Sequence, residues 1–487
     1  EFVLANGHRY NSGSPADRKR FEQDERDLCA GLMQIRQEIL ANEQMRNKIV
    51  RKYQIKNVTG YSMNAFVDFD NPMDIFAHVL IGSEGTLAYI ASGELNTLPL
   101  MPVYSSTMLY FPTVTAAAAH AKWLGDSGAR CVELMDYASL MSYLGKKCDL
   151  PKGTTVLLLD YGASSPEEMA DITARMTPQL KDLANLYKMD PFTTTVQARA
   201  DLWKMRNGIF PCVAGVRSPG ATVILEDVVA QVADLAYLVD GVQKLFVKYD
   251  YDGAIFGHAR DGNIHPLLTT PVDRPEQLDN FRHFMDDFVD HVVSLEGSLK
   301  GEHGTGRAIA PFVALEWGDE IYGLMKRLKK LADPGNVFNP GVIINDDPDC
   351  FLKPMKHMQL FGDKIGTPKA DMCIECGYCE HVCPTRDITF TPRQRLQALR
   401  VISAHPGDKQ LVKEYNFTGE QSCCSDGSCE MPCPMSISTA HVTDAIRALK
   451  IGKPFKAALT ESAEHYGSVE SVVRGMLRMA VATEKVI

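Results

Sequence analysis

The chain of 487 residues is 45% hydrophobic and 23% charged, the composition of a soluble globular protein with two to four domains. Its formal net charge of -10 at pH 7 argues against nucleic-acid binding as the main role, because phosphate contacts need a concentrated basic surface. No apolar run approaches the roughly 20 residues that span a bilayer, so we expect any membrane contact to be peripheral.

The cysteines divide into a cluster and a scattered remainder. Eight of the 13 lie between residues 373 and 433, a crowding that favours metal ligation by reduced thiols over disulfides. We therefore expect a cytoplasmic protein, and a peripheral position on the inner membrane face stays open. The sequence has no initiator Met and no signal-peptide pattern, and it begins in what reads as mid-domain, so we expect a piece of a longer protein.

Residues 1–95 are expected to open with a strand at 1–4, followed by one long amphipathic helix over about 14–53. An apolar strand over 77–81 then leads into a tight turn. The backbone N–H groups and hydroxyls of such a turn can meet a pyrophosphate, although an ordinary hairpin turn is the favoured interpretation of the segment taken alone. The turn consists of Gly82, Ser83, Glu84, Gly85 and Thr86.

From about residue 96 to 345, short apolar strands alternate with helical stretches. The pattern predicts an α+β domain in which long helices pack on one mixed or antiparallel sheet. The expected strands are 107–112, 154–161, 222–228, 254–258 and 263–268. The expected helices are 115–125, 166–186, 228–247, 275–294 and 311–331.

Two Gly-flanked segments of this region, 257–265 and 300–306, hold candidate metal ligands. A strand ending at His258 and a return strand carrying His265 would bring both imidazoles to one end of the sheet. With Glu302 they form the ligand set of a divalent cation site that leaves positions open for a substrate, and His303 remains for proton chemistry. Two isolated histidines near strand ends are more often ordinary hydrogen-bonded residues, but the second segment favours the site.

Arginines are the natural partners of a substrate carboxylate, because the guanidinium fork matches it in bidentate fashion. Arg206 lies on a predicted helix, and Arg217 lies in a Pro- and Gly-rich loop. For either one taken alone, a solvated surface arginine is the default interpretation.

After an acidic, Pro-containing linker at 345–350, a cysteine motif with the spacing C-x2-C-x2-C-x3-C-P predicts a 4Fe–4S cluster. Four thiolates could also hold zinc, but the three-cysteine ladder and the final Cys-Pro disfavour it. The pattern returns fifty residues later with one substitution. The first motif consists of Cys373, Cys376, Cys379 and Cys383, and the second of Cys423, Asp426, Cys429 and Cys433.

In two-cluster ferredoxins the fourth cysteine of each motif ligates the other cluster, so Cys433 is expected to complete the first site and Cys383 the second. A carboxylate is a harder and more labile iron ligand than a thiolate, so Asp426 predicts a weaker second cluster that can become 3Fe–4S. Alternatively, Cys424 is the ligand after a one-residue shift, and Asp426 is a turn residue beside Gly427. The sequence leaves both open.

The blocks 257–265, 301–306 and 338–341 resemble the signature blocks of the FAD-linked oxidase C-terminal domain of the vanillyl-alcohol-oxidase superfamily, found in D-lactate, D-2-hydroxyglutarate and glycolate dehydrogenases. The resemblance implies that His258, His265 and Glu302 bind a divalent metal (Mn, Fe or Zn) and that His303 is the base. It also implies that Arg206 holds the substrate carboxylate. FAD would contact residues 82–86 and Asn339.

The resemblance implies four segments. Residues 1–95 would be the latter part of the FAD-binding domain, and 96–345 the substrate or cap domain. Residues 346–450 would be an α-helical ferredoxin domain with helices at 392–404 and 437–449, and 451–487 a tail or the start of a further domain.

The expected reaction is oxidation of a D-2-hydroxy acid to the 2-oxo acid, with hydride transfer to FAD. Electrons would leave through two iron–sulfur clusters to a quinone, a cytochrome or a carrier protein. D-lactate is favoured, because residues 223–228 offer no second cation for the distal carboxylate of 2-hydroxyglutarate. The alternatives are a D-2-hydroxyglutarate dehydrogenase and an electron-relay subunit without its own flavin. Homo-oligomerisation stays open.

Overall fold

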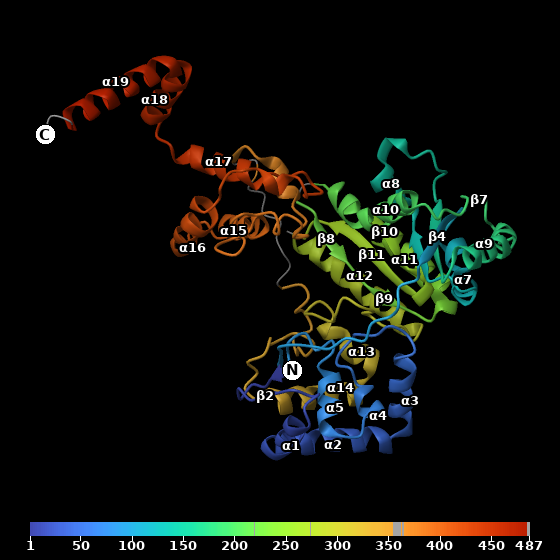
Figure 1. The fold of residues 1–487 in the computed structure, drawn as a ribbon. Helices are drawn as coiled ribbons and strands as arrows, with labels where there is room; N and C mark the ends of the chain where they lie inside the picture. The colour runs from blue at the N-terminus through green and yellow to red at the C-terminus, as the bar shows by residue number, and fades with distance from the viewer. Residues whose placement is uncertain (219, 273, 354–361, 363–364, 485–487) are drawn as a thin grey trace. The chain divides into compact units, whose positions relative to one another are not determined.

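The computed structural model describes residues 1–218, 220–272, 274–353, 362 and 365–484 (Figure 1). It divides into two compact units, Glu1–His357 and Met358–Ile487. The first mixes helices with sheets and the second is helical, which confirms the predicted α+β fold class with a helical C-terminal region. Among the described residues, no helix combines the length and the apolar character needed to cross a membrane.

The first unit begins with a small antiparallel sheet in the order β2-β1-β3 and a set of helices. The long helix predicted over 14–53 is wrong, because the chain leaves helical geometry at Glu25 and at Asn42, whose side chain accepts the N–H of Met45 and starts a new helix. The elements are β1 (Phe2–Val3), β2 (Arg9–Tyr10), α1 (Pro15–Asp24), α2 (Arg26–Ala41), α3 (Glu43–Lys52), α4 (Ala65–Asp68), α5 (Pro72–Val79) and β3 (Tyr89–Ile90).

The strand predicted just before the turn at 82–86 is also wrong, because α5 occupies most of that segment. Asn71 caps this helix by accepting the N–H of Asp74, and Pro72 follows at the first helical position, where its fixed φ favours a helix. The turn therefore follows a helix instead of a strand.

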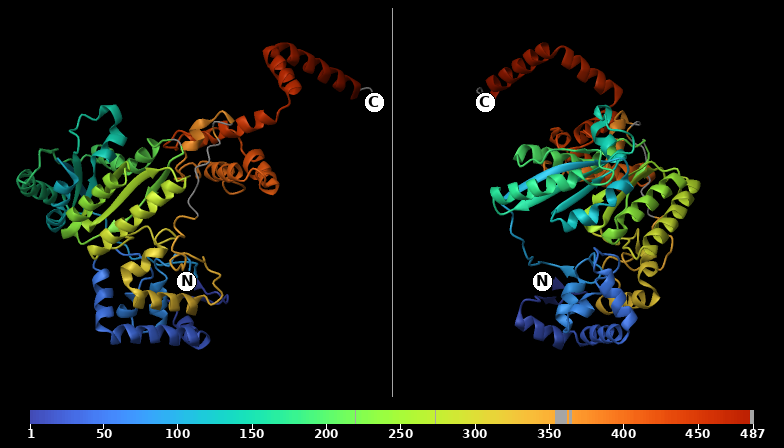
Figure 2. Two further views of the ribbon diagram at one scale, coloured as in Figure 1. Left: turned by 180° about the vertical axis from the view of Figure 1, so that it is seen from behind. Right: turned by 90° about the vertical axis from the view of Figure 1, so that its right-hand side faces the viewer.

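Two helices from late in the chain complete the core of this N-terminal part. These are α13 (Val313–Trp317) and α14 (Asp319–Ala332), which Figure 2 shows in yellow among the blue helices. Trp317 and Met325 are buried in the same hydrophobic cluster as Phe66 and Phe76. This packing brings the segment after α14 close to the turn at 82–86.

A larger antiparallel sheet follows, in the order β7-β4-β6-β5-β10-β11-β8, with β9 paired to β11. The predicted strands of this region are present, although the one predicted over 222–228 is divided into β8 and β9, and β5 and β7 were not predicted. The strands are β4 (Val103–Phe111), β5 (Cys131–Met135), β6 (Thr155–Ala163), β7 (Lys188–Met189), β8 (Thr222–Leu225), β9 (Val228–Val229), β10 (Gly253–His258) and β11 (Asn263–Thr270).

Helices cover both faces of this sheet (Figure 2). On β4, Leu109 and Phe111 face one core while Met108 and Tyr110 face the other, as the two-residue period of a strand requires. The first core contains α6 (Val114–Ala118), α7 (Ala121–Asp126), α9 (Pro166–Lys181), α11 (Leu235–Lys248) and α12 (Pro275–Ser294). The second contains α8 (Tyr137–Leu144) and α10 (Val196–Gly215).

The second unit is built from short helices around a small core that includes Leu396, Leu399 and Ile437. The helix predicted at 392–404 is confirmed, and Thr391 and Gln394 form its capping box. The one predicted at 437–449 begins two residues later, after the cap residue Ser438. The helices are α15 (Pro392–Ala404), α16 (Lys409–Tyr415), α17 (Thr439–Lys450), α18 (Lys453–Glu464) and α19 (Tyr466–Glu484).

Candidate active site and cluster sites

The two histidines predicted as metal ligands lie on adjacent antiparallel strands. His258 is two residues from Phe256 on β10, and His265 is two residues from Leu267 on β11, so both imidazoles point to the face that α10 covers. Gly257, which precedes His258, has a φ of +152°, and a Cβ there would lie 2.6 Å from the carbonyl oxygen of Asn263. Only glycine permits this close approach of the strands.

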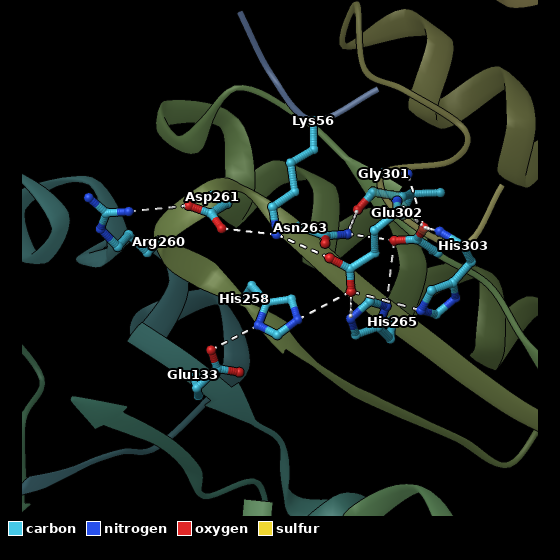
Figure 3. A network of polar contacts seen from close by, with 12 residues as sticks. Lys56, Glu133, His258, Arg260, Asp261, Asn263, His265, Gly301, Glu302 and His303 are labelled. Atoms are coloured by element: carbon cyan, nitrogen blue, oxygen red, sulfur yellow. Dashed lines mark hydrogen bonds and ion pairs between the residues drawn. The ribbon is translucent and has the colours of Figure 1, made fainter. Parts of the chain in front are cut away.

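Glu302 joins the two imidazoles. Its Oε1 lies 3.3 Å from Nε2 of His258 and 3.4 Å from Nε2 of His265, and its Oε2 lies 3.2 Å from Nζ of Lys56 (Figure 3). The hydrogen bond from His265 and the nearby charges of His258 and Lys56 hold the pKa of Glu302 far below its usual range, so it is ionised. The three potential ligand atoms lie within 4.8 Å of one another, a donor set that fits a divalent cation.

A second group of potential ligands, Asp227, His265 and His303, overlaps the first. Oδ2 of Asp227 already accepts the backbone N–H groups of residues 301–303 at 2.7–3.0 Å, and Oδ1 accepts the amide of Asn263 at 2.7 Å. A carboxylate with its acceptor positions filled in this way is a poor ligand. Asp227 therefore positions the loop that carries Glu302 and His303, and the first group is the better cation site.

His303 stands beside this cation site without sharing its ligand geometry. Its ring stacks on that of His265, with centroids 4.8 Å apart and an interplanar angle of 6°. Its Nε2 lies 3.9 Å from Oε1 of Glu302. Burial lowers the pKa of His303, so the ring is neutral at pH 7 and able to accept a proton.

Glu133 is a part of the site that sequence reasoning missed. It lies on β5 directly opposite His258 of β10, and its Oε1 contacts Nδ1 of that histidine at 2.8 Å. Its Oε2 accepts a hydrogen bond from Nε of Arg206 at 2.8 Å. Although burial opposes it, these two partners keep the pKa of Glu133 below its ordinary value, and its hydrogen bond raises the pKa of His258. A carboxylate at the second ring nitrogen fixes the orientation of a ligating histidine.

Arg206 thus lies next to the site, on α10, as the sequence indicated. Its Nε is held by Glu133, and its guanidinium carbon lies 5.3 Å from the ring centroid of Phe256. In the described part of the chain, Nη1 and Nη2 of Arg206 have no hydrogen-bond partner. A direct contact with a substrate carboxylate stays a prediction that these two nitrogens can satisfy.

The turn at residues 82–86 uses its side chains internally. The hydroxyls of Ser83 and Thr86 are buried and donate to the carbonyl oxygens of Leu80 and Ser83, at 2.8 and 2.7 Å. Gly82 and Gly85 are exposed and have φ of 79° and 66°. Their backbone N–H groups find no acceptor among the described residues, so they are the donors this turn can offer to a pyrophosphate.

Glu84 ties this turn to the loop of the metal site. Its carboxylate accepts the N–H of Thr305 at 2.6 Å and that of Gly306 at 2.9 Å. Asn339, also predicted to contact FAD, donates its amide to the carbonyl oxygen of Glu84 at 2.9 Å. Burial raises the pKa of Glu84. The predicted cofactor residues and the Glu302–His303 loop therefore belong to one connected structure.

In the second unit, one pocket gathers four cysteines from both motifs. These are Cys373, Cys376, Cys379 and Cys433. The structure thus brings the last cysteine of the second motif to the first three of the first motif, the exchange expected of a two-cluster ferredoxin. Four convergent thiols fit a 4Fe–4S cluster.

Cys383, the last cysteine of the first motif, does not line this pocket and is linked to the start of the second motif. The fully buried Arg395 joins the two motifs, with Nη1 3.6 Å from Sγ of Cys383 and Nη2 3.2 Å from Oγ of Ser422. Although burial opposes it, hydrogen bonds with Thr385 and Arg395 lower the pKa of the Cys383 thiol. A thiolate is the form that binds iron. The second motif also supplies Cys423, Cys429 and the exposed Asp426, which accepts a hydrogen bond from Ser428.

Comparison with protein families assigns two domains to the chain. Residues 101–343 match the FAD linked oxidases, C-terminal domain, and residues 372–438 match the 4Fe-4S dicluster domain. These matches support FAD and iron–sulfur clusters as the cofactors.

Named relatives are distant. The glycolate oxidase subunit GlcD of Bacillus subtilis is 25% identical over 298 residues, covering 60% of this chain and 59% of that protein. The mitochondrial D-lactate dehydrogenase (cytochrome) of Arabidopsis thaliana is 28% identical, covering 55% and 47%. The D-2-hydroxyglutarate dehydrogenase of Haemophilus influenzae is 23% identical, covering 61% and 31%. The chain spans less than two thirds of the length of each relative.

Among solved structures, p-cresol methylhydroxylase with bound substrate aligns with a TM-score of 0.38 and 13% identity, covering 51% of this chain and 54% of that one.

Proposed function

We propose that this chain, which joins an FAD linked oxidase C-terminal domain to a 4Fe-4S dicluster domain, oxidises a D-2-hydroxy acid to the 2-oxo acid. Hydride passes to FAD and electrons leave through the iron–sulfur clusters. The observation that carries the proposal is the convergence of His258, His265 and Glu302, with the neutral His303 stacked beside them. A cation site with an adjacent base is what removal of a hydroxyl proton before hydride transfer requires.

His258, His265 and Glu302 would hold Mn, Fe or Zn, and the cation supplies a Lewis acid that lowers the pKa of a bound hydroxyl. His303 accepts the hydroxyl proton, which its low pKa permits at neutral pH. The backbone N–H groups of Gly82 and Gly85 would hold FAD, which would supply the hydride acceptor.

The surrounding residues keep this arrangement in place. Glu133 fixes the ring of His258, and Asp227 fixes the backbone of residues 301–303. Arg206, joined to Glu133, can direct Nη1 and Nη2 to the substrate carboxylate. These contacts preorganise the site before substrate binds, which is the condition for efficient catalysis.

D-lactate is the favoured substrate because the other cations near the site are already paired. Nζ of Lys300 lies 2.8 Å from Oε2 of the buried Glu226. Nζ of Lys56 contacts both Asp261, at 3.0 Å, and Glu302, at 3.2 Å. A second substrate carboxylate would have to displace one of these partners, which costs more than binding a monocarboxylate.

Two alternatives remain distinct from this proposal. D-2-hydroxyglutarate as the substrate is favoured by the relative from Haemophilus influenzae that carries this name. An electron-relay subunit would keep the iron–sulfur domain but bind no flavin of its own. A visible absorption spectrum of the purified full-length protein separates the relay function from the other two, because only the relay lacks flavin bands.

Paired variants at adjacent positions test the roles in the site. His303→Asn should lower kcat by about 100-fold or more while metal content stays at the wild-type level, the range of general-base contributions. Glu302→Gln should lose both activity and metal. Equal metal loss in the two variants would contradict a separate base.

A comparison of two substrates tests the specificity. We expect a higher kcat/KM for D-lactate than for D-2-hydroxyglutarate. A tenfold preference for the dicarboxylate, about 1.4 kcal/mol of transition-state binding, would assign the second substrate instead.

A further inference from the structure

The two cysteine motifs of the second unit share one backbone conformation. Glu375 and Ser425, each two residues after the first cysteine of its motif, have φ of 62° and 52°. Gly377 and Gly427, two residues further on, have φ of 81° and 76°. A left-handed conformation at a non-glycine residue is uncommon, so its recurrence at the same place in both motifs shows that their turns correspond residue by residue.

Two arginines hold these turns in the same way. Nη2 of Arg400, on α15, donates to the carbonyl oxygen of Cys373 at 2.9 Å, and Nη2 of Arg447, on α17, donates to that of Cys423 at 2.9 Å. Nη1 of each arginine donates to the side chain of the left-handed residue, Glu375 or Ser425. The register of the second motif is thus fixed by contacts outside the turn.

This register places Asp426 where the first motif has Cys376. Both side chains are exposed on their turns, and Cys376 is one of the four cysteines around the first pocket. Cys424 corresponds to Ile374, which is not a ligand position. For Cys424 to take the place of Asp426, the turn would have to shift by two residues and give up the left-handed Ser425 and its contact with Arg447.

We infer that Asp426 is a ligand of the second cluster, together with Cys383, Cys423 and Cys429. This inference rests on the proposed function only in requiring that both clusters are present. Asp426 donates one carboxylate oxygen to iron, while Ser428 donates a hydrogen bond to the carboxylate. The second site is therefore a mixed oxygen and sulfur site, and the first has four thiolates.

Asp426 makes one iron of the second cluster removable. Carboxylate oxygen binds iron less tightly than thiolate does, so the iron at this position leaves first. Oxidation by ferricyanide converts 4Fe–4S with a 2+ core into 3Fe–4S with a 1+ core, one Fe²⁺ and one electron, which reduces ferricyanide to ferrocyanide.

The test uses the full-length protein, purified without oxygen, with iron and sulfide measured before and after a small excess of ferricyanide. Low-temperature EPR of the wild type should then show a 3Fe–4S signal of about one spin per chain, as one of the two clusters is converted. Asp426→Cys should abolish that signal and retain all the iron. Cys424→Ser, the matched control two residues away, should behave like the wild type.

Two results would overturn the inference. One is a second cluster that depends on Cys424 and is unchanged in iron content and EPR by Asp426→Ala. The other is a wild-type protein in which both clusters resist ferricyanide equally. Neither readout uses hydroxy-acid oxidation, so these outcomes leave the proposed function standing. Protein that binds no iron after anaerobic purification would instead contradict the electron-relay part of that function, and this inference with it.

Discussion

Asp227→Asn separates the loop-positioning role of this carboxylate from direct metal ligation. Asp227 is fully buried, and its Oδ2 accepts three backbone N–H groups, those of Gly301, Glu302 and His303, at 2.7–3.0 Å. The amide oxygen of asparagine can still accept these three bonds but carries no charge, and its NH2 group, in the place of Oδ1, cannot accept the hydrogen bond from Asn263. Hydrogen bonds to a charged group contribute about 1.5–3 kcal/mol to the free energy of unfolding, and neutral ones about 0.5–1.5 kcal/mol. Each of the three backbone bonds therefore loses about 1 kcal/mol in the variant, and the three together lose about 3 kcal/mol.

Tryptophan fluorescence can measure this loss selectively. All three tryptophans, Trp123, Trp203 and Trp317, lie in the unit Glu1–His357. Urea unfolding followed by fluorescence therefore reports on that unit and not on the iron–sulfur unit. Asp240→Asn is the matched control, because Asp240 pairs with Lys244 on the surface of α11 and its loss should cost less than about 0.5 kcal/mol.

The variant also has a consequence for the metal site. The loop that Asp227 holds carries Glu302, so equilibrium dialysis should show weaker metal binding by about 10- to 100-fold, the usual cost of losing a supporting contact. Iron and sulfide content should not change. A variant that unfolds like the wild type and binds metal with equal affinity would refute the positioning role.

Three further predictions concern other parts of the chain. Chelation should abolish 2-hydroxy-acid oxidation and Mn, Fe or Zn should restore it, whereas His265→Ala with full activity and metal content would contradict the site. Arg395→Gln should lower the reduction potential of the second cluster in an EPR-monitored titration, because the lost N–H donor to Cys383 favoured the reduced state. Burial raises the pKa of Asp136 from 3.8 to about 6. Its ionisation therefore lowers the free energy of unfolding, by an amount that is zero below pH 3.8, grows between pH 3.8 and pH 6, and is constant above pH 6. Asp136→Asn should thus stabilise the protein by up to about 3 kcal/mol at pH 8, with a smaller gain at pH 5 in urea unfolding.

Local sequence was sufficient to predict that His258, His265 and Glu302 come together. Gly257 ends a short apolar strand, and the two-residue period of the next strand returns His265 to the same face. The cysteine spacing predicted the cluster motifs for the same reason, since ligand positions in a turn are set by neighbouring residues. Asp426 was visible as a departure from that spacing, but its register became clear only from Arg400 and Arg447.

Contacts between distant segments could not be predicted in this way. Glu133 reaches His258 across 125 residues because β5 pairs with β10, and β5 itself was not predicted. Asp227 acts through the backbone of a loop more than seventy residues later. Polar residues of the turn at 82–86 looked free in the sequence, yet the hydroxyls of Ser83 and Thr86 are bonded within the fold. Burial of these groups depends on tertiary packing.

Reduction of the flavin by substrate tests the central claim most directly. The full-length protein, free of oxygen, is mixed with D-lactate in a stopped-flow instrument while flavin absorbance is followed. We predict rapid bleaching in the metal-replete wild type, and a rate lower by about 100-fold or more both in His303→Asn and after removal of the divalent metal with iron–sulfur content unchanged. Bleaching at the wild-type rate in the metal-free protein or in His303→Asn would contradict a cation site with His303 as its base.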